Sequence, residues 1–134
     1  MPIILNHSLI FLLLLFNLSV SGATEPDQVL KLLTSSSFDD KARAIEQLAQ
    51  TGSETSERLL NAMAQGDLYY VKSNKRIVLI KNQDSKIQLT DALTGEELGL
   101  VSKRKVKKVS VNNKLRGQIS TVISNFKLSH LDAN

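Results

Sequence analysis

The spacing of apolar side chains predicts three helices between residues 24 and 66. Apolar residues recur at helical spacing in three groups, at positions 29–33, 42–49 and 59–63. The second and third groups are each preceded by a serine suited to N-capping and followed by a glycine suited to ending a helix, namely Ser37 with Gly52 and Ser53 with Gly66. Helices of this length joined by short turns pack antiparallel, so residues 24–66 are expected to form a HEAT-like helical hairpin region.

Beyond residue 66 the apolar pattern changes from helical spacing to alternation. Apolar or alternating runs bounded by turn-forming residues predict short strands at 68–71, 76–80, 87–92 and 98–100, and a last strand or extended segment at 106–111. Helical spacing returns after Asn112 or Asn113, either of which suits an N-cap, with a stripe of Leu115, Ile119, Val122, Ile123 and Phe126. The pattern indicates an α+β fold, with the antiparallel helical hairpin first. Residues 67–134 then form a small antiparallel β part, rich in basic residues, and a closing amphipathic C-terminal helix.

The first 23 residues have the features of a secretory signal peptide. Eight apolar residues run from Leu9 to Phe16, and Ser21 and Ala23 occupy the −3 and −1 positions of a cleavage site after Ala23. No Lys or Arg precedes the apolar run, which departs from the usual signal pattern, and an uncleaved membrane anchor is the alternative interpretation. Either interpretation predicts that the rest of the chain is exported.

The composition of the chain argues against several classes of chemistry. Its 134 residues contain no Cys, which excludes disulfides, a thiolate nucleophile and Cys-based metal sites. The two histidines, His7 and His130, lie near opposite ends of the chain. Adjacent acidic residues point in different directions on a helix or a strand, so neither acidic pair, 39–40 or 96–97, is expected to act in catalysis. We expect no enzymatic activity, no cofactor and no metal.

Charge is divided unevenly along the chain, whose formal net charge is +4. Residues 24–65 hold four basic and seven acidic side chains, whereas residues 66–134 hold 13 basic and six acidic ones. No acidic residue occurs between Glu97 and Asp132. This interval contains a cluster of seven basic residues: Lys103, Arg104, Lys105, Lys107, Lys108, Lys114 and Arg116. This cluster is either a solvated face or a contact surface for an acidic protein or for anionic lipid at a membrane surface. Nucleic acid is not expected as a partner, because the nearest aromatic residue is Phe126.

Three segments resemble the extracytoplasmic N-terminal region of urea-type ABC transporter permeases, in the branched-chain amino-acid permease family. They are DLYYVKSNKRIVLI (67–80), IQLTDALTGEELG (87–99) and KKVSVNNKLRG (107–117). They carry, in the family's order, a Leu-Tyr strand at Leu68–Tyr69, a turn at Thr90–Gly95 and a helix start at Asn112–Arg116. The resemblance implies a location in the periplasm or at the periplasmic face of the inner membrane. It also implies three partners: a permease transmembrane core, a solute-binding protein and ATPase subunits.

The family continues into a bundle of transmembrane helices, whereas this sequence ends at Asn134 before any such bundle. A solute path through a bilayer must be lined by helices or a closed barrel, so this chain alone is not expected to conduct a solute. The resemblance therefore implies a truncated extracytoplasmic permease domain, accessory to the uptake of urea or branched-chain amino acids. The alternative is a free-standing periplasmic protein-interaction module without a role in transport.

Overall fold

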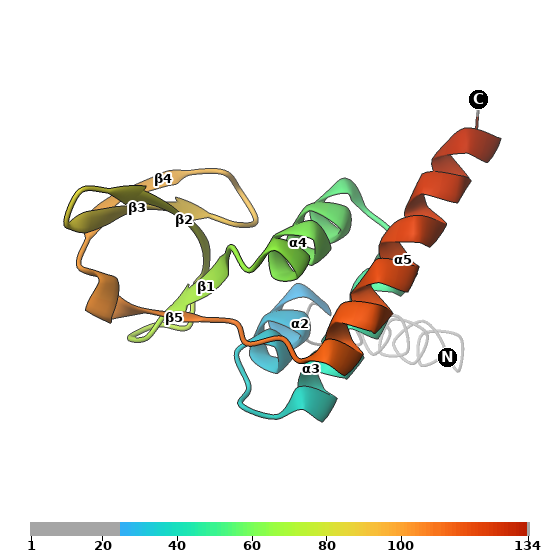
Figure 1. Cartoon of the computed structure of the whole chain (residues 1–134), viewed down its shortest axis with the longest axis horizontal. Helices are drawn as coiled ribbons and strands as arrows, with labels where there is room; N and C mark the ends of the chain where they lie inside the picture. The colour runs from blue at the N-terminus through green and yellow to red at the C-terminus, as the bar shows by residue number, and fades with distance from the viewer. Residues whose placement is uncertain (1–24, 134) are drawn as a thin grey trace, which may run out of the picture.

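The computed structural model describes residues 25–133, and the predicted signal peptide or anchor (1–23) lies outside them (Figure 1). Three helices come first: α2 (Glu25–Leu33), α3 (Phe38–Thr51) and α4 (Glu54–Gln65). Five strands and a one-turn 3-10 helix follow, and α5 ends the described chain. Their bounds are β1 (Leu68–Val71), β2 (Ile77–Gln83), β3 (Lys86–Asp91), β4 (Glu97–Val101), η2 (Lys103–Lys105), β5 (Val106–Lys108) and α5 (Asn113–Asp132). The predicted mixed fold of helices and sheet is confirmed. Within residues 25–133 no helix is both long and apolar enough to cross a bilayer.

The predicted helix caps are confirmed. Side-chain oxygens of Ser37, Ser53 and Asn112 accept hydrogen bonds from the backbone amide three residues on, at 3.4, 3.1 and 2.9 Å. Gly52 and Gly66 end α3 and α4 in the left-handed region, with φ of 58° and 78°. The change of period at Gly66 is therefore also the point where the chain leaves α4 and enters the sheet.

The five strands form one curved antiparallel sheet in the order β4-β3-β2-β1-β5, seen at the left of Figure 1. β4 and β5 are the two edges, and η2 connects them. Of residues 106–111, for which a last strand or an extended segment is predicted, only Val106–Lys108 form the strand β5. Its partner β1 begins at Leu68, whose carbonyl accepts the last bond, from the Val109 amide at 2.9 Å.

Two hairpin turns in the sheet have the same backbone geometry. Between β1 and β2 the Val71 amide donates to the Arg76 carbonyl at 2.9 Å. Between β3 and β4 the Asp91 amide donates to the Glu96 carbonyl at 2.8 Å. The fifth residue of each turn has a positive φ, 61° at Lys75 and 77° at Gly95. Glycine adopts that conformation without strain and lysine does not.

Buried apolar residues form two clusters, and β1 contributes to both. Leu68 and Tyr70 belong to the first, which also holds buried residues of the four described helices α2 to α5. Tyr69 and Val71 pack against the second, which is built from the strand residues Val78, Ile87, Leu89 and Val106. Because successive side chains of a strand point to opposite faces, β1 forms a wall of both clusters.

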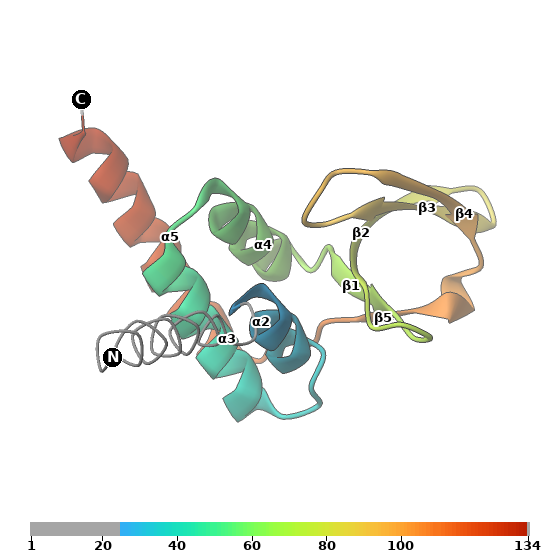
Figure 2. The same ribbon diagram turned by 180° about the vertical axis from the view of Figure 1, so that it is seen from behind.

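The C-terminal helix covers the other helices rather than the sheet (Figures 1 and 2). It contacts α3 and α4, with Leu115 and Ile119 fully buried, and the Gln118 side-chain amide donates to the Ala42 carbonyl at 3.0 Å. The rest of the predicted stripe is partly buried against the same cluster. The last turns extend past these contacts, and Leu128 and Leu131 are 59% and 72% exposed.

Candidate functional site: a lysine-rich surface beside a buried lysine

The first three residues of the predicted basic cluster form the 3-10 turn η2. The Ser102 hydroxyl accepts from the Arg104 amide at 3.4 Å, and the Lys105 carbonyl accepts from the Lys72 amide at 2.9 Å. These bonds fix the main chain against the β1–β2 loop. The side chains of Lys103, Arg104 and Lys105 are exposed, so their charge faces solvent.

The remaining predicted residues lie on β5 and at the start of α5. Lys107 and Lys108 are opposite Tyr70 and Tyr69 of β1, and both line a cavity of about 420 Å³. Arg116 lines a second hollow of about 230 Å³ together with Lys108. Lys114 is exposed in the first turn of α5. The structure therefore brings Lys107, Lys108 and Arg116 around two adjoining hollows, and η2 forms a separate exposed group.

A residue that the sequence analysis missed, Lys41, is among the residues that line the larger cavity. Only 4% of Lys41 is exposed, and its ammonium donates to the Ser110 carbonyl at 3.0 Å. The ammonium also lies 5.1 Å from the centre of the Phe38 ring, within range of a cation–π interaction. Burial lowers the pKa of Lys41, and the positive charge of Lys107 lowers it further. These contacts join the first turn of α3 to the segment after β5.

The spacing of the buried residues along α3 shows how Lys41 could have been predicted to be buried. The apolar residues chosen for the buried face were Ala42, Ile45, Leu48 and Ala49. The buried residues are Lys41, Ala44, Ile45 and Leu48, at i, i+3, i+4 and i+7. A lysine at the helical spacing of buried apolar residues is expected to become buried, with its charge, when the chain folds.

The larger cavity is lined by four lysines, at positions 41, 75, 107 and 108. They come from α3, from the β1–β2 loop and from β5, and the side chains of Ser36, Tyr70 and Ser110 share the lining. Among the described residues that line the cavity none is acidic. The carboxylate of nearby Asp40 accepts from the Ser35 hydroxyl at 2.7 Å and lies 3.8 Å from Arg43. The cavity therefore presents cations and hydroxyl groups, a combination suited to an anion.

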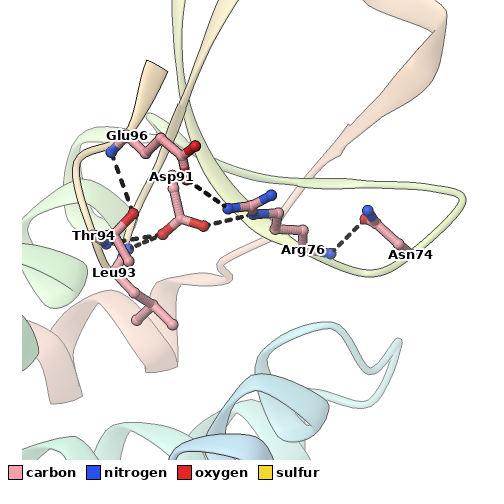
Figure 3. A network of polar contacts seen from close by, with 6 residues as sticks. All are labelled: Asn74, Arg76, Asp91, Leu93, Thr94 and Glu96. Atoms are coloured by element: carbon pink, nitrogen blue, oxygen red, sulfur yellow. Dashed lines mark hydrogen bonds and ion pairs between the residues drawn. The ribbon is translucent and has the colours of Figure 1, made fainter. Parts of the chain in front are cut away.

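The turn at Thr90–Gly95 is held by a network around Asp91 (Figure 3). One carboxylate oxygen of Asp91 accepts from Arg76 Nε at 2.6 Å, and the other accepts from the amides of Leu93 and Thr94 at 2.8 and 2.9 Å. Burial by itself would raise the pKa of Asp91, but the two amides and Arg76 outweigh it, so this pKa is lowered. Arg76 also contacts Glu96 at 3.4 Å. Both carboxylate oxygens of Asp91 therefore accept hydrogen bonds that hold the turn, so Asp91 stabilises the fold.

The acidic pair 96–97 and the histidine of the described residues lie on different elements. Glu96 lies in the turn between β3 and β4, where its amide donates to the Thr94 hydroxyl at 3.2 Å, and Glu97 begins β4. His130 Nε2 lies 3.3 Å from Glu57 on the exposed side of α5. No group of three or more His, Asp or Glu residues between 25 and 133 is placed to hold a metal ion.

Comparison with known proteins returns no significant match to a protein-family model, a curated protein or a solved structure. The resemblance to urea-type ABC transporter permeases therefore stays a prediction.

Proposed function

We propose that this chain is an accessory extracytoplasmic domain of a urea or branched-chain amino-acid type ABC uptake system, which contacts an acidic surface of a partner through η2. The observation that carries the proposal is a set of three consecutive cations, Lys103, Arg104 and Lys105, on a turn whose main chain is fixed and whose side chains are exposed. A fixed turn loses little backbone entropy when a partner binds.

The charges of η2 are not used within the fold. The ion pairs of residues 25–133 join Arg43 and Arg76 to acids, and none involves residues 103–105. Exposed cations attract an acidic protein surface over about 10 Å at moderate salt, which speeds encounter more than it strengthens the complex. Such a surface suits a component that meets its partner repeatedly during solute uptake.

The partners in this proposal follow from the resemblance. They are the solute-binding protein and the transmembrane core of the permease, with ATPase subunits on the far side of the membrane. A HEAT-like hairpin region of α2, α3 and α4, exported behind a signal peptide or anchor, belongs to the same proposal. Support for the hairpin comes from the connection between α3 and α4, which consists of only Gly52 and Ser53.

The experiment compares binding of the purified chain to the solute-binding protein of a urea-type uptake system across a series of salt concentrations. The test variant is Lys103→Gln/Arg104→Gln/Lys105→Gln. Its control, Lys81→Gln/Lys86→Gln/Lys127→Gln, removes the same charge from exposed positions elsewhere. We expect binding that weakens as salt rises, is lost in the test variant and is retained in the control.

Uptake of labelled urea or leucine by cells lacking the gene separates the two roles. Reduced uptake, restored by the wild-type gene but not by the η2 variant, supports the transport role. Unchanged uptake of both solutes refutes it and assigns the chain to the alternative, a free-standing interaction module.

A further inference from the structure

We propose that the lysine-lined cavity between α3, the β1–β2 loop and β5 binds a phosphate group, carried either by a soluble phosphomonoester or by a lipid headgroup. The cavity of about 420 Å³ has room for such a group, and four lysines converge on it from three separate segments. This inference is independent of the proposed function, because η2 does not line the cavity.

The buried ammonium of Lys41 is placed to donate to a ligand. An ammonium has three donors, and Lys41 gives one of them to the Ser110 carbonyl at 3.0 Å. The ammonium also lies 5.1 Å from the centre of the Phe38 ring, and Lys41 lines the cavity, so in the proposed complex a remaining N–H group donates to the oxyanion. A hydrogen bond from a buried ammonium is screened by salt much less than one on the surface.

The arrangement of charge around the cavity is by itself unfavourable to the protein. Lys41 is removed from water and is repelled by Lys107, and both effects disfavour its charged form. Lys75 lies over the Tyr70 ring at 4.9 Å rather than against a carboxylate. An anion held between these groups would offset the repulsion, since opposite charges a few ångströms apart attract strongly in a partly buried site.

The type of cation favours phosphate over carboxylate. Planar carboxylates are recognised best by the two-pronged guanidinium of arginine, and no arginine is among the described residues that line the cavity. Lysine binds phosphate as a point charge, and several lysines suit a tetrahedral group that carries up to two negative charges. Ser36, Tyr70 and Ser110 also line the cavity, and each carries a hydroxyl group of the type that can donate to a phosphate oxygen.

The test measures binding of glycerol phosphate to the full purified protein by isothermal titration calorimetry. Lys107→Gln carries the test, because its exposed position makes the substitution compatible with folding. We expect this variant to bind at least about tenfold more weakly, the effect of losing one charge-assisted hydrogen bond. The control Lys86→Gln removes the same charge from an exposed position on β3 and is expected to change affinity less than about twofold. Lys41→Gln, accepted only if its circular dichroism matches the wild type, is expected to weaken binding at least as much as Lys107→Gln.

Three results would overturn the proposal: no binding of glycerol phosphate, equal losses in Lys107→Gln and Lys86→Gln, or acetate bound as tightly as glycerol phosphate. Vesicles of phosphatidic acid, compared with vesicles of phosphatidylcholine, identify the source of the phosphate. Vesicle binding that is lost in Lys107→Gln supports a lipid headgroup. Binding of glycerol phosphate without vesicle binding supports a soluble phosphomonoester.

Discussion

Replacing Asp91 by Asn should destabilise the sheet, and the size of the effect follows from the contacts of one carboxylate. Asp91 is 6% exposed and accepts three hydrogen bonds. Asn has the same shape but only one acceptor oxygen. If the Asn oxygen still accepts the hydrogen bonds from the amides of Leu93 and Thr94, its NH₂ group faces the N–H of Arg76. Two donors then face each other without an acceptor, and the hydrogen bond to Arg76 is lost. Losing a buried, charge-assisted hydrogen bond in this way costs about 2–3 kcal/mol.

The pH dependence gives this prediction a second signature. The pKa of Asp91 is lower in the folded protein than in the unfolded chain, where it is about 3.9. The contribution of its ionised form is therefore complete above about pH 5 and is lost as the pH falls through the folded-state pKa. The difference in stability between wild type and Asp91→Asn should shrink below about pH 4, because the carboxylate of the unfolded wild-type chain is then protonated and folding must release that proton.

Urea unfolding at pH 7 and pH 3, followed by circular dichroism, measures both effects. Asp67→Asn is the matched control, since Asp67 is exposed and its substitution should change stability by less than about 0.5 kcal/mol. The reasoning is refuted if Asp91→Asn is no less stable than Asp67→Asn at pH 7, or if its deficit is as large at pH 3 as at pH 7.

Three further predictions concern a turn, a helix and the N-terminus. Gly95→Ala should cost about 1 kcal/mol in urea unfolding, since its added Cβ meets no atom within 4 Å and only the left-handed backbone opposes it. Lys75→Gly, in the equivalent turn, should change stability in the opposite direction, and equal signs for the two would contradict the shared geometry. Ile119→Ala should lower the free energy of unfolding by about 2–5 kcal/mol. Leu128→Ala, exposed on the same helix, should leave it nearly unchanged, and a comparable loss there would show that α5 packs differently. Mass spectrometry of the exported protein should find cleavage after Ala23, and a full-length mass would instead favour the membrane anchor.

The elements of this fold were predictable because their signals are local. A capping serine such as Ser53 accepts from an amide only three residues further along the chain. A glycine such as Gly66 ends the helix that directly precedes it. Alternation in the strands is equally local. What α5 covers was not predictable, because its stripe would fit a sheet face as well as a groove between helices.

The candidate site was predictable only in part. The run of cations at 103–108 is visible in the sequence, but its division into a 3-10 turn and a three-residue strand depends on pairing with β1. Lys41 was overlooked because a lysine is normally assigned to the polar face. Its burial depends on the Ser110 carbonyl, 69 residues further along the chain. Long-range contacts of this kind leave no local pattern to read.

The position of β1 between the two apolar clusters has a consequence for how the molecule unfolds. Melting the helices would expose one face of β1, and opening the sheet would expose the other. Unfolding of either the helices or the sheet therefore exposes buried apolar residues of the other part. Small domains with shared elements of this kind unfold as one cooperative unit, so amide protons of α3 and β2 should exchange with deuterium at similar slow rates.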